Sequence, residues 1–239
     1  MESLKEKSCL VTGATRGIGR AIARSLLDCG AHVTICGRRQ DAVNETVASL
    51  ARESGNDKVA GKAADVRDDE QVAELFRFID ARFGGLDVLV NNAGVGVFSA
   101  ISGLSIQDWR DTIETNLSGV FYCTREALPR FGTRGGGYIV NISSLAGKNP
   151  FAGGAAYNAS KFALTGFSEA VMLDVRNENV RVSYVMPGSV ATEFSGSAAS
   201  GRDWKIWPED IAEIVRMLLQ MPIRTLISRV EVRPARPKR

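Results

Sequence analysis

Short apolar segments rich in β-branched residues alternate with longer segments of helical periodicity along the whole chain. Seven candidate strands cover residues 8–13, 31–37, 58–66, 86–92, 137–143, 180–187 and 225–232. Six candidate helices lie between them, at residues 17–29, 39–54, 68–83, 108–131, 155–178 and 208–221. Such alternation is typical of parallel βαβ units. The pattern therefore predicts an α/β fold in which helices cover both faces of a doubly wound parallel sheet.

The length of 239 residues, of which 44% are hydrophobic, is enough for one large core. No linker or internal repeat divides the chain, so we expect a single domain over residues 1–239. The 24 glycines gather in short motifs, which favours tight turns where the backbone approaches a ligand closely. In a parallel sheet such a ligand binds beyond the carboxyl ends of the strands.

Charge and cysteine content exclude several classes of protein. The 30 basic and 27 acidic residues leave a net charge of +3, which is too balanced to predict a nucleic-acid partner. The four cysteines form no CxxC pair and there is one histidine, so we predict buried, inert thiols and no metal site. No apolar leader and no run of about 18 apolar residues is present. We therefore expect a soluble, cytoplasmic protein with no membrane partner.

The C-terminal run at residues 233–239 is basic but interrupted by prolines. We predict a frayed, solvated tail there in preference to a binding arm, because short terminal segments are usually poorly ordered.

The first strand is followed by a glycine-rich loop, "TGATRGIG" at residues 12–19, that leads into a helix. Glycines in this place let the backbone present its N–H groups and the positive end of the helix to a pyrophosphate. A tight turn without a ligand is the alternative. The predicted cofactor contacts in this loop are Gly13, Thr15, Arg16, Gly17, Ile18 and Gly19.

The second strand ends in Gly37-Arg38-Arg39, where an NAD-binding protein would carry an acid for the ribose hydroxyls. Asp41 lies further on, inside the next predicted helix. Arg38, with Arg16 from the glycine loop, suits the 2′-phosphate of NADP(H), since a charge pair at ~4 Å is worth about 4 kcal/mol before desolvation. For Arg39 a solvated helix start is the better interpretation. The cofactor prediction is therefore NADP(H).

Two further strand ends add candidate cofactor contacts. Asp65, followed by Val66, is placed to accept a hydrogen bond from an adenine amino group, and an N-cap of the next helix is an equally good interpretation. The end of the fourth strand reads Asn91-Asn92-Ala93-Gly94. We expect Asn92, Ala93 and Gly94 beside the ribose, with an ordinary Asn-rich turn as the alternative.

Six motifs in order resemble those of the short-chain dehydrogenase/reductase superfamily, and the resemblance covers nearly the whole chain. They are "TGATRGIG" (12–19), "NNAG" (91–94), Asn116 in "NLSG", Ser144 in "ISS", "YNASK" (157–161) and "PG" (187–188). The resemblance implies a single Rossmann-type domain with a sheet of about seven strands.

It also implies roles for four residues. Tyr157 matches the catalytic acid/base, Lys161 its partner, Ser144 the group that binds the substrate oxygen, and Asn116 the residue that holds a proton-relay water. A free phenol has a pKa of ~10, so a catalytic one needs help near neutral pH. Lys161 shares a helix face with Tyr157, and we predict that its charge lowers the tyrosine pKa. Asn116 falls within a predicted helix, where it either bends the helix around a water or occupies a polar edge.

The loop after the sixth strand faces the nicotinamide in the family, which implies cofactor contacts from Pro187, Gly188, Val190 and Thr192. The bland interpretation is a Pro-Gly turn with a helix cap. Residues 193–207 correspond to the family's substrate lid. Apolar walls are predicted from Phe98, Leu145, Phe151, Phe194, Trp204 and Trp207, although ordinary packing explains each of them equally well.

Together these features predict an NADPH-dependent oxidoreductase that reduces a carbonyl to a secondary alcohol. The nearest resemblance is to 3-oxoacyl-carrier-protein reductases and related carbonyl reductases, so the substrate is expected to be a small molecule or an acyl thioester. The alternative is a catalytically inactive NADP-binding sensor or scaffold. The resemblance also implies a homotetramer or homodimer formed through the segments 108–131 and 155–178.

Overall fold

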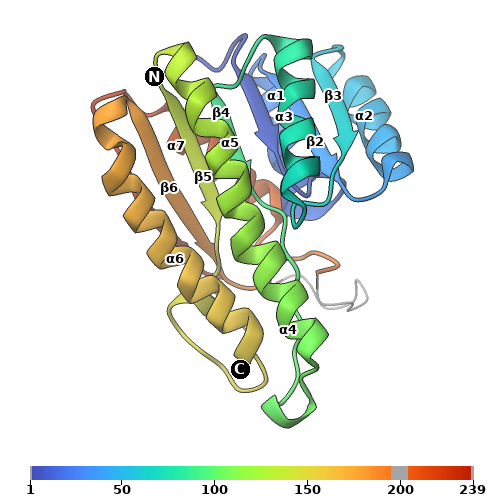
Figure 1. Ribbon diagram of the computed structural model, residues 1–239, viewed down its shortest axis with the longest axis vertical. Helices are drawn as coiled ribbons and strands as arrows, with labels where there is room; N and C mark the ends of the chain where they lie inside the picture. Colours follow the sequence, from blue (N-terminus) through green and yellow to red (C-terminus); the bar gives the residue numbers. More distant parts are fainter. Residues whose placement is uncertain (1, 195–203, 238–239) are drawn as a thin grey trace.

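The computed structural model describes residues 2–194 and 204–237. Seven strands form one sheet in the order β3-β2-β1-β4-β5-β6-β7, and all neighbours are parallel. The prediction of an α/β fold built on a doubly wound parallel sheet is confirmed (Figure 1). The strands are β1 (Ser8–Val11), β2 (His32–Gly37), β3 (Val59–Ala63), β4 (Val88–Asn91), β5 (Gly137–Ile142), β6 (Val180–Pro187) and β7 (Arg229–Val232).

Helices cover both faces of this sheet, as its strands, buried on both sides, require. One face carries α1 (Gly17–Asp28), α2 (Gln40–Ser54) and α7 (Pro208–Gln220) around one apolar cluster. The other carries α3 (Asp69–Phe83), α5 (Gly119–Arg134) and α6 (Ala155–Val175) around a second cluster. Alternate residues of β1 belong to different clusters, Cys9 and Val11 to the first and Leu10 to the second.

The helix predicted at residues 108–131 is interrupted. It consists of α4 (Ile106–Ile113), a π-helical turn η2 (Glu114–Ser118) and α5. The last strand also differs, because it begins at Arg229 and not at residue 225. Thr225 lies in a turn instead, where its N–H donates to the Pro222 carbonyl at 2.8 Å.

All strands present their carboxyl ends at the same edge of the sheet, since all are parallel. The order in which successive strands are added to the sheet reverses at β1 and β4, which are neighbours and pair through Cys9 and Val88. Loops that leave these two strands diverge and open a crevice. Figure 1 draws the N-terminus and the C-terminus at opposite ends of the molecule. The segment that follows β7 therefore starts at the edge where a ligand is expected.

Candidate active site

A cavity of about 1120 Å³ lies at this edge of the sheet. All the predicted site residues line it except Gly19 and Asn116. The lining members of that set are Gly13, Thr15, Arg16, Gly17, Ile18, Arg38, Asp65, Val66, Asn92, Ala93, Gly94, Ser144, Tyr157, Lys161, Pro187, Gly188, Val190 and Thr192. Four predicted apolar residues, Phe98, Leu145, Phe151 and Phe194, line it as well, together with Trp204. Trp207 is more than half exposed and is not among the lining residues.

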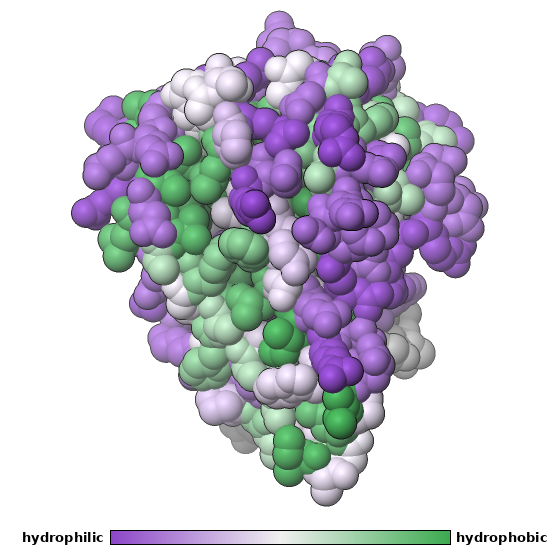
Figure 2. All heavy atoms as spheres, viewed as in Figure 1, coloured by the Kyte–Doolittle hydropathy of each residue, from purple (hydrophilic) through white to green (hydrophobic). Residues whose placement is uncertain are grey.

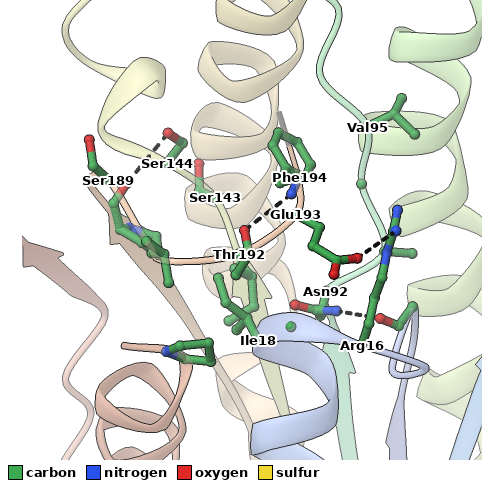
Figure 3. Close-up of a pocket in the computed structure, with 18 of the residues that line it drawn as sticks. Arg16, Ile18, Asn92, Val95, Ser143, Ser144, Ser189, Thr192, Glu193 and Phe194 are labelled. Carbon is green, nitrogen blue, oxygen red and sulfur yellow. Dashed lines mark hydrogen bonds and ion pairs between the residues drawn. The ribbon is translucent and has the colours of Figure 1, made fainter. Parts of the chain in front are cut away.

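The glycine loop is held by the segment that follows β4. Gly13 has a φ of +62°, and a Cβ atom there would lie 2.7 Å from the Ala93 Cα atom, so only glycine fits. The Asn92 side-chain amide donates to the carbonyls of Thr12 and Gly13 at 2.9 and 3.1 Å (Figure 3). Gly19 packs against this amide and not against the cavity. Asn92 therefore shapes the glycine loop, and its place beside a ribose stays a prediction.

The two arginines after β2 have different surroundings. Arg38 is exposed and lines the cavity. Arg39 precedes α2 and its guanidinium pairs with Asp41 at 2.5 Å, away from the cavity lining. Arg16 pairs with Glu193 at 3.4 Å, and Figure 3 shows the two side chains pointing toward each other. Both members of this pair are about 70% exposed, so the pair is weak and leaves Arg16 available to an anion.

Asp65 forms an ion pair with Arg67, whose guanidinium also reaches Asp111 of α4 at 2.5 Å. The hydrogen bonds from Arg67 hold the pKa of Asp65 below its ordinary value. The N-cap of α3 is Asp68, which accepts a hydrogen bond from the Gln71 N–H at 3.0 Å. The interpretation of Asp65 as that N-cap is therefore wrong.

Ser144, Tyr157 and Lys161 come together on one wall of the cavity. Ser144 follows β5, and the other two lie one turn apart on α6. The Lys161 ammonium donates to the Ile142 carbonyl at 3.0 Å and lies 5.8 Å from the centre of the Tyr157 ring. Phe98 and Phe194 pack on this ring at centroid distances of 5.5 and 5.8 Å. The tyrosine is thus fixed between apolar rings with its hydroxyl beside Ser144.

Burial dominates the acidity of this pair. Burial raises the pKa of Tyr157, and a hydrogen bond with Ser144 lowers this pKa by a smaller amount. Burial lowers the pKa of Lys161 to about 8. In the protein alone the net shift of the Tyr157 pKa is therefore upward, because burial disfavours the phenolate; the lowering by Lys161 stays a prediction.

Ser143 and Ser144 both line the cavity, but their hydroxyls have different partners. Ser143 is buried and its hydroxyl bonds to the Lys161 carbonyl and to Thr165, both at 3.5 Å. The Ser144 hydroxyl contacts the Pro187 carbonyl at 3.5 Å (Figure 3). Ser143 thus fastens β5 to α6, while Ser144 faces the cavity.

Asn116 lies in the π-helical turn, behind the cavity wall. Its amide accepts from the Val95 N–H at 2.8 Å and donates to the Val95 carbonyl at 2.9 Å and to Ser160 at 3.0 Å. A Cβ atom on Gly94 would lie 3.2 Å from the Asn116 oxygen. Asn116 therefore fixes the loop after β4, and its role in a proton relay stays a prediction.

The family model described as short chain dehydrogenase matches residues 7–203. The chain belongs to the short-chain dehydrogenase family. It is an oxidoreductase of that family, with the family's fold. The chain is 35% identical, over 94% of its length and 94% of the relative, to an NADP-dependent 3-hydroxy acid dehydrogenase of Shigella flexneri.

Two solved structures resemble this short-chain dehydrogenase closely. An alcohol dehydrogenase from the archaeon Thermococcus sibiricus, complexed with 5-hydroxy-NADP, has a TM-score of 0.89 and 31% identity, over 98% of this chain and 99% of that one. A variant of actinorhodin polyketide ketoreductase with NADPH has a TM-score of 0.87 and 32% identity, over 98% of each chain.

In this short-chain dehydrogenase the lid predicted at 193–207 falls largely on residues 195–203, which lie outside the described residues. The described residues on either side of this gap are joined by two hydrogen bonds. The Ala191 N–H donates to the Ile206 carbonyl at 2.8 Å, and the Ile206 N–H donates to the Ser189 carbonyl at 3.1 Å. None of the helices in the described ranges has both the length and the apolar character needed to cross a membrane.

The C-terminal segment departs from its prediction. Arg233, Pro234 and Pro237 line the cavity, although Arg233 and Pro237 are exposed as the prediction of a solvated tail expects; residues 238 and 239 lie outside the described residues. The signal that was missed is topological. A segment that follows the last strand of a parallel sheet leaves from the carboxyl edge, where the site lies.

Proposed function

We propose that this oxidoreductase reduces a carbonyl group to a secondary alcohol by hydride transfer, with Tyr157, Ser144, Lys161 and Asn116 as its catalytic set. The observation that carries the proposal is that a phenol, a hydroxyl and a buried ammonium share one wall of the cavity, which also contains the glycine loop. A polarised carbonyl oxygen needs two donors close together and a charge that supports them.

The cofactor is NADP(H), as relatives across the family bind or use it. The residues present fit this group. The glycine loop lines the cavity ahead of the N-terminus of α1, and Arg38 and Arg16 supply positive charge to the cavity. When bound, NADPH supplies a hydride to the carbonyl carbon. We infer that the glycine loop, the loop after β4 and residues 187–192 hold it.

In the proposed reaction the carbonyl carbon receives the hydride and its oxygen gains negative charge. The Tyr157 hydroxyl donates a proton to this oxygen, and the Ser144 hydroxyl donates a hydrogen bond to it. Lys161 stabilises the phenolate that remains, because its ammonium lies on the same helix face. Oxidation of the alcohol reverses each step. The apolar rings of Phe98 and Phe194 keep water from the tyrosine.

The substrate class that we propose is a 3-oxo compound, either a 3-oxo acid or a 3-oxoacyl thioester. Support comes from two relatives, one named for 3-hydroxy acids and the other for polyketide ketoreduction. An inactive sensor or scaffold would be expected to lack one of Ser144, Tyr157 and Lys161. All three line the cavity, which favours the enzyme.

The test is to incubate the protein with NADPH and a panel of simple ketones, 3-oxo esters, 3-oxo acids and 3-oxoacyl thioesters, and to follow loss of NADPH absorbance. We expect consumption with 3-oxo compounds above that with simple ketones. NADPH binding without consumption across the panel would contradict the proposal.

We further propose that the protein is a homo-oligomer that associates through α5 and α6. Apolar side chains gather on this face in Figure 2, and Phe121, Phe162 and Leu173 are each more than 40% exposed. A groove of about 630 Å³ runs between the two helices, lined by Phe121, Leu128, Phe167 and Val171 among others. Exposed apolar surface of this kind marks an interface.

A further inference from the structure

The C-terminal segment, residues 233–237, forms part of the wall of the catalytic cavity. It leaves β7 at the carboxyl edge of the sheet, where Val232 pairs with Pro187 of β6. The Gly188 N–H then donates to the Val232 carbonyl at 2.8 Å. These contacts fix the start of the segment next to the loop that begins at Pro187.

The segment packs over Gly188 and approaches Leu145. A Cβ atom on Gly188 would meet Leu145 at 3.1 Å and Pro234 at 3.2 Å, so these two side chains approach each other over Gly188. Leu145 directly follows Ser144, the proposed donor to the substrate oxygen. Pro234 therefore lies near the residue that follows Ser144, and Arg233 directly precedes Pro234 in the chain.

A cluster of charges surrounds the start of this segment. The Glu231 carboxylate pairs with Lys148 at 2.7 Å, with Arg233 at 3.1 Å and with Arg229 at 3.9 Å. One carboxylate thus faces three cations, and the cluster carries a surplus of two positive charges. The Arg233 side chain is 55% exposed and lines the cavity. Lys205 adds a further positive charge to the wall.

Acidic residues also line the cavity, but they come from other segments. Glu193 is paired with Arg16, Asp65 with Arg67, and Glu209 belongs to the first turn of α7. Among the charged residues that pair with Glu231, Arg233 is the one that also lines the cavity.

We propose that Arg233, supported by the cluster around Glu231, selects substrates that carry an anionic group, a carboxylate or a phosphate, close to the carbonyl that is reduced. A cavity wall with a local excess of one charge raises the concentration of ligands of the opposite charge. This inference rests on the proposed function and adds the chemical class of its substrate. The three cations share one acceptor, so Arg233 keeps donors for an incoming anion.

The experiment compares a 3-oxo ester that the enzyme reduces with the free acid of the same carbon skeleton, at saturating NADPH. The readout is the ratio of kcat/KM for the acid to kcat/KM for the ester. Arg233→Gln is expected to lower this ratio on the order of 10-fold, which corresponds to about 1.4 kcal/mol. Raised ionic strength should lower the ratio for the wild type and affect the variant less, since salt screens exposed charges.

The matched control is Arg236→Gln. Arg236 has the same charge and lies in the same segment, but it is exposed and does not line the cavity. We expect its ratio to stay within twofold of the wild type. Equal ratios for Arg233→Gln and the wild type, or equal losses in the two variants, would overturn the proposal. Unchanged NADPH affinity in both variants shows that they are folded.

Two arms distinguish the source of the anion. A 3-oxo acid presents a carboxylate, whereas hydroxyacetone phosphate presents, close to its carbonyl, a phosphate that hydroxyacetone lacks. If Arg233→Gln lowers kcat/KM for the anionic member of a pair and not for its neutral counterpart, the inference is supported, and that pair identifies the anionic group. If the wild type reduces the neutral esters with no anionic preference, this inference fails alone. If it reduces nothing in the panel, the proposed function fails with it.

Discussion

Arg38 and Arg39 are neighbours in the chain, but only Arg38 lines the cavity. At the scale of single residues this difference comes from the start of α2, where Arg39 turns toward Asp41. Ser143 and Ser144 both line the cavity, but the hydroxyl of the buried Ser143 bonds to the Lys161 carbonyl and that of Ser144 to the Pro187 carbonyl. Adjacent residues of one type thus offer matched pairs for mutation.

Arg38→Asp should shift the cofactor preference from NADPH toward NADH by about tenfold or more, because loss of even 1.4 kcal/mol of phosphate binding is a factor of ten. The measurement is kcat/KM for each cofactor at a fixed carbonyl concentration. Arg39→Asp is the control and should leave the preference nearly unchanged. A preference that survives Arg38→Asp intact would show that Arg16 or another group recognises the phosphate.

The burial of Lys161 predicts a dependence of stability on pH. Its pKa is lowered from 10.5 to about 8 in the folded protein, so between these values the unfolded chain binds the proton and the folded chain does not. The free energy of unfolding must therefore rise with pH from about 8 to about 10.5, and this contribution is lost as pH falls back through that range.

Denaturant unfolding of the wild type and of Lys161→Met, compared at several pH values from 7.5 to 10, measures this contribution. The free energy of unfolding of the wild type, minus that of Lys161→Met, should increase as pH increases. A constant difference would mean that Lys161 keeps an ordinary pKa in the fold.

Among the helices and strands, the π-helical turn between α4 and α5 is the element that the sequence pattern did not predict. The apolar period continues through residues 108–131, so the pattern predicted one helix, and a single extra residue in a turn barely disturbs that period. The signal available was Asn116, an amide at a helical position, which was expected either to bend the helix around a water or to occupy a polar edge. The structure adds what the amide bonds to, the Val95 backbone.

Asn116→Ala should destabilise the protein by about 1–3 kcal/mol, because it leaves the N–H and the carbonyl of Val95 without their partner. It should also lower kcat, since Gly94 and Val95 form the wall beside Lys161. Ser160→Ala is the comparison, as it removes one hydrogen bond of the Asn116 amide and spares both bonds to Val95. An effect of Asn116→Ala no larger than that of Ser160→Ala would contradict the positioning role.

At the scale of the whole molecule, strand ends from distant parts of the chain meet because every strand is parallel. This rule, together with the motifs, predicted a set of site residues of which nearly all line the cavity. It was not applied to β7, and the C-terminal segment was missed for that reason. The acidity of Tyr157 also escaped prediction, because burial depends on Phe98 and Phe194, which come from loops with no periodic pattern.

The apolar face on α5 and α6 predicts association at this scale. Light scattering of the purified protein should give the mass of a dimer or tetramer. Phe121→Glu should lower that mass, because Phe121 is 44% exposed on the groove and a charge there opposes burial. Ile101→Glu, at an exposed residue outside the groove, is the control. A monomeric mass for the wild type would exclude the proposed interface.

The most direct test of the central claim is the turnover of Tyr157→Phe with NADPH and the best 3-oxo substrate. Removal of one hydroxyl leaves the ring and its contacts with Phe98 and Phe194 in place, so NADPH affinity should stay close to that of the wild type. If Tyr157 donates the proton, kcat should fall roughly 10²–10⁴-fold. A variant that binds NADPH and reduces the substrate at the wild-type rate would contradict the account.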